Sequence, residues 1–174
     1  QEIEYQCEGQ RYVGQLAVPD GGGKAPGVLV AHEGPGIDDN AKNRARRLTE
    51  AGFVTFALDY IGDGKRLEGM PAVMEKLGPL MQNPLQTRTI GQAGLDVLTG
   101  CDRTDTSKLA AIGHCFGGTM ALELARGGAP LAAVVGFHSG LATARPDDAA
   151  NITGKVLVCI GAEDPLIPPQ QRVD

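Results

Sequence analysis

Five short apolar segments recur along the chain, and each is separated from the next by enough residues for a helix. They are rich in Val, Leu, Ile and Ala and lie at residues 27–32, 53–59, 108–114, 131–138 and 155–161. A continuous apolar strand is buried on both faces, as in a parallel sheet with helices above and below it. The pattern therefore predicts the α/β class, with a mostly parallel sheet covered by helices on both faces.

The segments between these strands predict the rest of the fold. Residues 3–18 alternate around a Glu-Gly-Gln turn, which predicts an N-terminal antiparallel hairpin. A crossover helix is expected from a cap at Asp38 or Asp39 to Gly52, with its basic residues on a solvated face. Residues 60–86, rich in Gly, Pro and Met, predict an excursion that either covers a pocket or fills the core with its three Met. A helix is expected to follow over residues 88–98.

Composition narrows the class of protein. The chain has 16 basic and 21 acidic residues and a net charge of −5, which argues against nucleic-acid binding. No apolar run approaches the ~18 residues of a membrane span. Four widely spaced cysteines, without zinc-ligand spacing or a preceding signal peptide, predict free thiols in a reducing cytoplasm. We expect one domain over residues 1–174, trimmed at its C-terminal end because the chain stops just after a Pro-rich turn.

The most informative local pattern lies at the end of the strand at 108–114. Glycines stand two residues before and two residues after Cys115, at Gly113 and Gly117, where a strand runs into a helix. This is the layout of a nucleophile elbow, in which a Cβ at the flanking positions would collide with backbone. A thiol at a helix N-terminus is also favoured as a thiolate. We therefore predict that Cys115 is a nucleophile and that His114, which leaves the turn in another direction, at most lines the pocket.

A nucleophilic cysteine needs a base and a group that orients the base. Asp164, 49 residues after Cys115 and at the end of the strand at 155–161, fits the hydrolase order of nucleophile, acid and histidine, with Glu163 as its rival. His138 ends the strand at 131–138, at the same sheet edge, so it is a candidate for the pocket lining and a less favoured candidate for the base. Ten residues follow Asp164 and none is a histidine, so the catalytic histidine is expected beyond residue 174.

The loop after the first core strand reads His-Glu-Gly-Pro-Gly. Hydrolases supply the second oxyanion-hole amide from this loop, so we expect the backbone N–H of Phe116 as one donor and that of Gly34 as the other. Glu33 lies at the end of the same strand. A carboxylate close to Cys115 would raise the pKa of the thiol and keep it protonated until substrate arrives.

Together these residues resemble the dienelactone hydrolase family, a branch of the α/β hydrolases with a cysteine nucleophile. The matching segments cover almost the whole chain in the family's order: AHEGPG at 31–36, ALDYIGDG at 57–64, AAIGHCFGG at 110–118, VVGFHSG at 134–140 and GAEDPLIP at 161–168. The resemblance implies that Cys115 is the nucleophile, Asp164 the triad acid and Glu33 the resting partner of the thiol. It implies the oxyanion hole at Phe116 and Gly34.

The resemblance also implies the activity: hydrolysis of an ester or lactone through an acyl-enzyme, without a metal or an organic cofactor. The substrate would be a small molecule, and the protein a cytoplasmic monomer or small homo-oligomer with no nucleic-acid or membrane partner. The family's last strand and helix, and its histidine, are expected beyond residue 174. In the family, arginines bind a carboxylate of the substrate, and Arg88 and Arg66 are the candidates for this role here.

Two other functions compete with the hydrolase. A dinucleotide-binding oxidoreductase is possible because a strand precedes Gly34-Pro35-Gly36, and Asp59 lies 23 residues past Gly36. Asp39 stands where the third glycine should be, however, and the acidic loop would repel a pyrophosphate. A non-catalytic binding domain that keeps the hydrolase scaffold is the other alternative.

Overall fold

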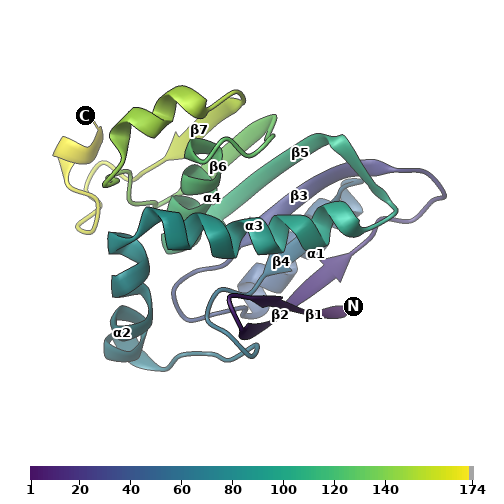
Figure 1. Ribbon diagram of the computed structural model, residues 1–174, viewed down its shortest axis with the longest axis horizontal. Helices are drawn as coiled ribbons and strands as arrows, with labels where there is room; N and C mark the ends of the chain where they lie inside the picture. Colours follow the sequence, from purple (N-terminus) through teal and green to yellow (C-terminus); the bar gives the residue numbers. More distant parts are fainter. Residues whose placement is uncertain (173–174) are drawn as a thin grey trace.

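The computed structural model describes residues 1–172, which fold around one seven-stranded sheet (Figure 1). The strands are β1 (Glu2–Cys7), β2 (Gln10–Ala17), β3 (Ala25–Ala31), β4 (Val54–Leu58), β5 (Thr104–His114), β6 (Ala133–Phe137) and β7 (Lys155–Cys159). The helices are α1 (Asp39–Glu50), α2 (Gly69–Gln82), α3 (Pro84–Gly100), α4 (Phe116–Arg126) and the short 3₁₀ turns η1 (Pro146–Asn151) and η2 (Pro169–Arg172). Both the predicted parallel strands and the predicted hairpin are present.

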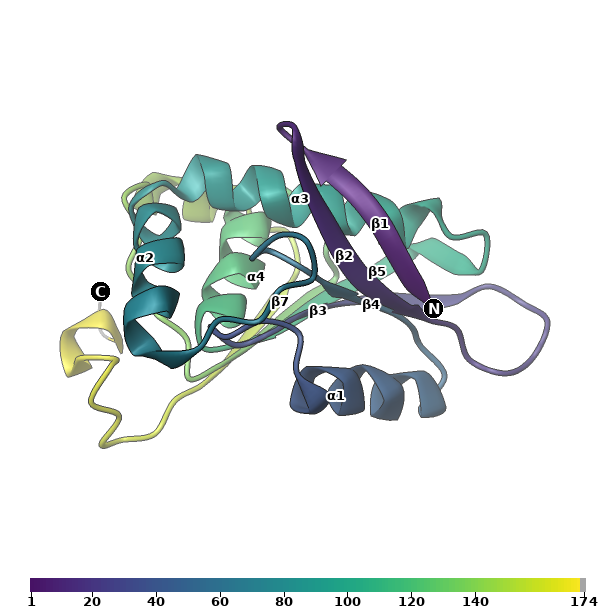
Figure 2. The same ribbon diagram turned by 90° about the horizontal axis from the view of Figure 1, so that it is seen from below.

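The sheet has the order β1-β2-β4-β3-β5-β6-β7. The hairpin β1–β2 joins β4 antiparallel, whereas β4, β3, β5, β6 and β7 are parallel to one another. Helix α1 lies on one face of the sheet, and α3 and α4 lie on the other (Figure 2). The prediction of a mostly parallel sheet with helices on both faces is confirmed, as is the N-terminal antiparallel hairpin.

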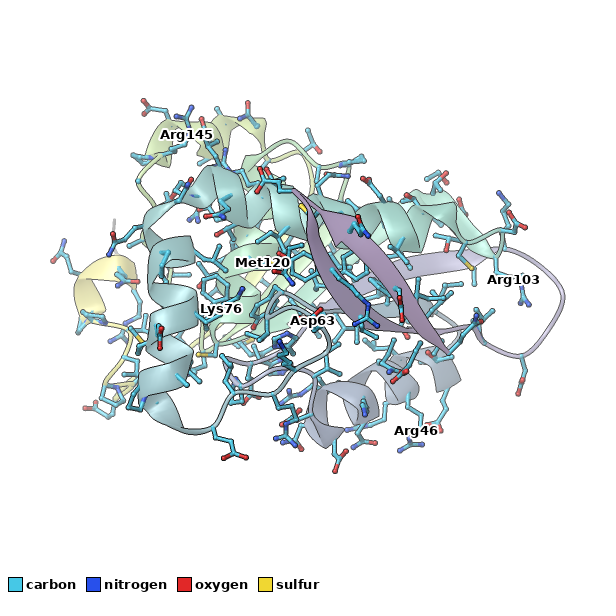
Figure 3. The ribbon with its side chains drawn as sticks, turned by 60° about the horizontal axis from the view of Figure 1, so that its bottom comes forward. Arg46, Asp63, Lys76, Arg103, Met120 and Arg145 are labelled. Atoms are coloured by element: carbon cyan, nitrogen blue, oxygen red, sulfur yellow. The ribbon has the colours of Figure 1, made fainter. Side chains whose placement is uncertain are left out.

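The hydrophobic core is divided by the sheet. The larger part lies between the sheet and α3 and α4, where Phe56, Leu58 and Met120 are fully buried (Figure 3 labels Met120). The smaller part joins β3 and β4 to α1 through Val30 and Ala45. Burial of these side chains is the main stabilising contribution to a fold of this kind. At the far edge of the sheet, β7 carries two exposed apolar side chains, Val156 and Leu157.

Helix α1 begins where its cap was predicted. The side chain of Asp38 accepts a hydrogen bond from the backbone N–H of Ala41 at 2.9 Å, and Ala41 and Ala45 face the sheet. Arg46, on the opposite face, is exposed and pairs with Glu50 (Figure 3). The expected solvated basic face is therefore present at Arg46.

Residues 60–86 contain a helix, α2, which was not predicted because this segment is rich in Gly and Pro. Helix α2 buries Val73, Leu77 and Leu80 at helical spacing, and it ends just before Asn83, which caps α3. A Cβ built on Gly34 would lie 2.7 Å from the side chain of Val73. Helix α2 therefore packs directly against the loop that follows β3.

Candidate active site

The side chains predicted for catalysis lie at the carboxyl ends of four neighbouring parallel strands, β3, β5, β6 and β7. Ligands of open α/β sheets bind at this edge. The backbone N–H of Cys115 donates to the carbonyl of Phe137 at 2.9 Å, so the contact between β5 and β6 continues into the turn that holds the thiol. His138 directly follows Phe137, the last residue of β6, so its backbone lies close to that of Cys115.

Cys115 lies in a strained turn between β5 and α4. Its φ is +54° and its ψ is −125°, a conformation that non-glycine residues rarely adopt. A Cβ on Gly113 would lie 2.1 Å from the carbonyl oxygen of Gly117, and one on Gly117 would lie 2.3 Å from the carbonyl oxygen of His32. A Cβ on Gly118 would overlap the hydroxyl of Ser139. Three glycines, one more than the pattern required, allow α4 to start directly above the sheet.

The surroundings of the thiol favour its protonated form. Burial raises the pKa of Cys115, and the charges of Glu33 and Asp164 raise it further, while the backbone N–H of Phe116 works in the opposite direction. The backbone N–H of Phe116, the expected oxyanion donor, is close enough to the sulfur to lower its pKa. A thiol with a raised pKa becomes a good nucleophile only when a base or a bound substrate favours its deprotonated form.

Glu33 binds an arginine that sequence reasoning did not single out. Its carboxylate accepts a hydrogen bond from Arg44 of α1 at 2.9 Å, and its side chain is 40% exposed. Glu33 is close enough to Cys115 to raise the pKa of the thiol. Arg44 looked like one member of a solvated basic face because nothing in the sequence of α1 shows which of its arginines faces the loop after β3.

Asp164 is hydrogen-bonded to His138, which joins the turn after β7 to the end of β6. The side chain of Asp164 is 6% exposed, and it also accepts from the backbone N–H of Leu166 at 2.9 Å. Burial acts to raise the pKa of Asp164, but the bonds from Leu166 and His138 outweigh it and the pKa is lowered. His138 shares the left-handed conformation of Cys115, with φ +54°. The structure therefore supplies an ionised carboxylate that orients an imidazole, a pairing that sequence spacing did not reveal.

The remaining candidates lie in different surroundings. His114 stacks on Phe137 with ring centroids 4.7 Å apart, and burial, followed by the charge of Arg44, lowers its pKa. Arg66 is exposed and lies beside Gly36 in the loop after β3.

Arg88 is engaged away from the elbow. It donates to Glu123 at 2.8 Å and to Asp148 at 2.6 Å, and its side chain is 13% exposed. It lines a surface cavity with Cys7 and Asp96. Its ion pairs join α3 to α4 and η1, and leave the guanidinium without a free fork for a substrate carboxylate.

Asp59, the acid that the dinucleotide interpretation required, is 1% exposed. Its two carboxylate oxygens accept hydrogen bonds from four backbone N–H groups, those of Val13, Ile61, Gly62 and Gly64. A carboxylate held in this way cannot bind a ribose. The dinucleotide-binding interpretation is therefore wrong, and Asp59 instead fixes the loop after β4.

Residues 1–172 contain no cluster of His, Cys, Asp and Glu side chains that could hold a metal ion. Over the same residues, no helix combines the length and the apolar character that a membrane crossing requires.

Comparison with known proteins identifies the family. The family model described as the dienelactone hydrolase family matches residues 13–174. The chain belongs to the dienelactone hydrolase family. A solved structure titled "m3DLH" is 44% identical and superposes with a TM-score of 0.95, over 99% of this chain and 72% of that one. These findings agree with the α/β-hydrolase fold that the sequence predicts.

Two other known proteins are also similar to this chain. A protein of Aquifex aeolicus (strain VF5) named "Putative carboxymethylenebutenolidase" is 31% identical over 133 residues, which are 72% of this chain and 54% of that protein. The structure of a "Dienelactone Hydrolase-like Promiscuous Phospotriesterase P91" from metagenomic libraries is 40% identical, with a TM-score of 0.95 over 99% of this chain and 72% of that one. The chain spans about half the length of the carboxymethylenebutenolidase relatives that it matches.

Proposed function

We propose that the protein hydrolyses a small carboxylic ester or lactone through an acyl-enzyme on Cys115. The observation that carries the proposal is the left-handed conformation of Cys115 at the N-terminus of α4, with glycines on both sides that a Cβ could not replace. This geometry presents a side chain above the sheet edge where substrates bind. Membership of the dienelactone hydrolase family supports the same chemistry.

The first half of the reaction follows from the atoms around the thiol. The Cys115 sulfur forms a bond to the substrate carbonyl carbon, and the π electrons of the carbonyl move to its oxygen. We place this oxyanion between the backbone N–H groups of Phe116 and Gly34. When the tetrahedral intermediate collapses, the bond to the alcohol oxygen breaks, the alcohol leaves with the proton that the Cys115 thiol gave up, and a thioester remains on Cys115.

The second half of the reaction needs a base to activate water, a contribution of about 10²- to 10⁴-fold. We propose Asp164 as the acid that orients this base, because it is buried, ionised and already bonded to an imidazole. For the base itself we retain the histidine that the family resemblance implies after residue 174. The hydrogen bond between His138 and Asp164 favours His138 as the second candidate.

We propose further that the enzyme acts on small molecules without a metal or organic cofactor. It would be a cytoplasmic monomer or small homo-oligomer that binds neither nucleic acid nor membrane. A triad and two backbone amides supply nucleophile, base and oxyanion stabilisation, so the reaction requires no further group. The net charge of −5 and four free cysteines support these assignments. Arg66, exposed beside the loop after β3, is our candidate for binding a substrate carboxylate.

The test is turnover of p-nitrophenyl acetate and of a dienelactone by the purified protein and matched cysteine variants. We expect Cys115→Ala to abolish turnover, and Cys159→Ala, which removes an exposed thiol, to leave it unchanged. Full activity in Cys115→Ala would contradict the proposal, and no turnover by the wild type on either substrate would favour the non-catalytic scaffold.

Two further variants assign the acid and the base. Asp164→Asn should reduce turnover by about 10²- to 10⁴-fold, because the base loses its orientation. His138→Asn should leave turnover unchanged if the base follows residue 174, and should abolish release of the acyl group if His138 is the base. An active Asp164→Asn enzyme would exclude Asp164 from the triad.

A second substrate class deserves a direct trial, because a 40% identical relative is titled a promiscuous phosphotriesterase. Attack of the Cys115 sulfur on a neutral phosphotriester would expel the same p-nitrophenolate, with the phosphoryl oxygen in the oxyanion hole. Hydrolysis of a dialkyl p-nitrophenyl phosphate that disappears in Cys115→Ala would support this activity. Hydrolysis that persists in that variant would exclude Cys115 as its nucleophile.

A further inference from the structure

The carbonyl group of Glu33 accepts hydrogen bonds from three donors. The ring Nδ1 of His32 lies 2.5 Å from this oxygen, the hydroxyl of Tyr60 lies 3.1 Å from it, and the backbone N–H of Gly36 lies 3.2 Å from it. The Tyr60 hydroxyl has a single proton and shares it with the carbonyl of His32, the nearer acceptor at 2.5 Å. Two successive peptide groups at the end of β3 are thus held by side chains buried beneath them.

The bond to Glu33 fixes the chemical state of His32. A carbonyl oxygen can only accept, so Nδ1 carries the proton. Nε2 is buried and has no hydrogen-bond partner among residues 1–172, and the whole side chain is inaccessible to solvent. Burial lowers the pKa of His32 to about 4, so the ring is neutral at physiological pH. The ring stacks on Tyr60 with centroids 3.7 Å apart.

This arrangement is costly for a purely structural pair. A buried ring nitrogen without a partner destabilises a fold, whereas an apolar side chain of similar size would not. What the two side chains provide is a fixed position for the carbonyl of Glu33, and with it for the peptide group between Glu33 and Gly34.

The orientation matters because the peptide group is planar and trans. No cis peptide bond occurs in the described chain, so the N–H of Gly34 points away from the side on which the Glu33 carbonyl is held. On the same stretch, the carbonyl of His32 lies against α4, since a Cβ on Gly117 would come within 2.3 Å of it. The end of β3 and the first turn of α4 are therefore in contact, and the amides of Gly34 and Phe116 belong to the two sides of this contact.

We infer that His32 and Tyr60 are positioning residues that aim the N–H of Gly34 into the oxyanion hole. The inference rests on the proposed function, which assigns Gly34 as an oxyanion donor. Neither side chain touches the substrate. His32 acts through the Glu33 carbonyl, and Tyr60 acts through the carbonyls of His32 and Glu33. Together they make the loop after β3 rigid before substrate binds, which is what a preorganised oxyanion donor requires.

The test compares two reactions of Cys115 that differ in their need for an oxyanion donor. Acylation by p-nitrophenyl acetate passes through an oxyanion, whereas alkylation by iodoacetamide does not. For Tyr60→Phe, which keeps the ring, we expect acylation to slow by about tenfold or more, within the 10²- to 10³-fold effect of losing one donor outright. Alkylation should stay within about twofold of the wild-type rate because it creates no charge on a carbonyl oxygen. Tyr12→Phe, at another buried tyrosine, should change neither rate.

A pair of His32 variants keeps the inference testable if Tyr60→Phe fails to fold. The amide nitrogen of His32→Asn occupies nearly the position of Nδ1, so this variant should retain most of the acylation rate. The amide nitrogen of His32→Gln lies nearer the position of Nε2 and cannot replace the Nδ1 donor, so acylation should slow while alkylation stays unchanged.

The outcomes separate the inference from the function on which it rests. A wild-type protein that alkylates but never acylates would refute the proposed function, and the inference with it. A wild-type protein that acylates, with Tyr60→Phe acylating equally fast, would overturn the inference alone. Equal losses of acylation in His32→Asn and His32→Gln, or a parallel loss of acylation and alkylation in folded Tyr60→Phe, would also overturn it.

Discussion

Two turns at the same edge of the sheet are built in opposite ways. The turn after β5 depends on missing side chains, since Gly113, Gly117 and Gly118 leave no room for a Cβ. The turn after β3 depends on side chains that are present, since His32 and Tyr60 hold its carbonyl groups from below. Steric exclusion fixes the nucleophile, and hydrogen bonding fixes the loop opposite it.

The difference predicts how each turn responds to change. A turn held by close backbone contacts has no way to adapt to added volume, because its neighbours are main-chain atoms. A turn held by hydrogen bonds can lose one donor and keep its path, but its stability then depends on the protonation state of the donors. We therefore expect added volume in the turn after β5 to cause a large loss of stability, and loss of one hydrogen-bond donor in the turn after β3 to cause a smaller loss.

The largest effect is expected from Gly117→Ala in the turn after β5. Its Cβ would lie 2.3 Å from the carbonyl oxygen of His32 and 2.4 Å from that of Ala31, so β3 and α4 must separate. We expect a loss of about 3 kcal/mol or more in the free energy of unfolding, measured by urea denaturation. Gly100→Ala is the control, because a Cβ there meets no atom within 4 Å. Equal stability of Gly117→Ala and the wild type would show that the two elements do not abut.

An intermediate effect is expected from protonation in the turn after β3. Burial lowers the pKa of His32 to about 4 from its ordinary 6.5, although the charges of Asp59, Asp38 and Glu33 oppose the shift. Between about pH 6.5 and pH 4, the unfolded chain therefore binds a proton at His32 that the folded chain does not bind. Stability from this group is complete above about pH 6.5 and falls as the pH drops toward 4, by up to ~1.4 kcal/mol per pH unit.

His32→Asn isolates this contribution from the other titrating groups. Its free energy of unfolding should be lower than that of the wild type at pH 7, and the gap should narrow as the pH falls to 4. Unfolding curves in urea at several pH values measure the gap. A gap that stays constant with pH would mean that folding does not lower the pKa of His32.

The smallest effect is expected from Glu33→Gln. Its negative charge raises the pKa of Cys115, so its removal should lower that pKa, and only slightly because the side chain is 40% exposed and paired with Arg44. The rate of iodoacetamide alkylation against pH reports the shift. Glu50→Gln, which breaks the exposed pair with Arg46, is the control and should leave the profile unchanged. An upward shift for Glu33→Gln would refute its electrostatic role.

The sequence could predict what local patterns encode. Apolar strands, the hairpin and the cap at Asp38 follow from residues within a few positions of one another. The glycines around Cys115 predict the strained turn for the same reason. Helix α2 was harder to predict, because Gly78 and Pro79 interrupt its helical pattern while its buried side chains preserve it.

Contacts between distant segments could not be predicted in this way. Tyr60 lies 27 residues from the carbonyl of Glu33 that it holds. Likewise, the bond between His138 and Asp164 spans 26 residues, and the placement of Arg88 depends on ion pairs with α4 and η1. Sequence spacing cannot predict such pairs, because they depend on the order of the strands in the sheet.

The central claim is that Cys115 forms the acyl-enzyme. Its most direct test is the intact mass of the protein after brief exposure to p-nitrophenyl acetate and acid quenching, followed by peptide mapping. We predict one acetyl group on the peptide that contains Cys115, and none in Cys115→Ala. An acetyl group on Cys159 or on lysine with Cys115 unmodified would contradict the claim.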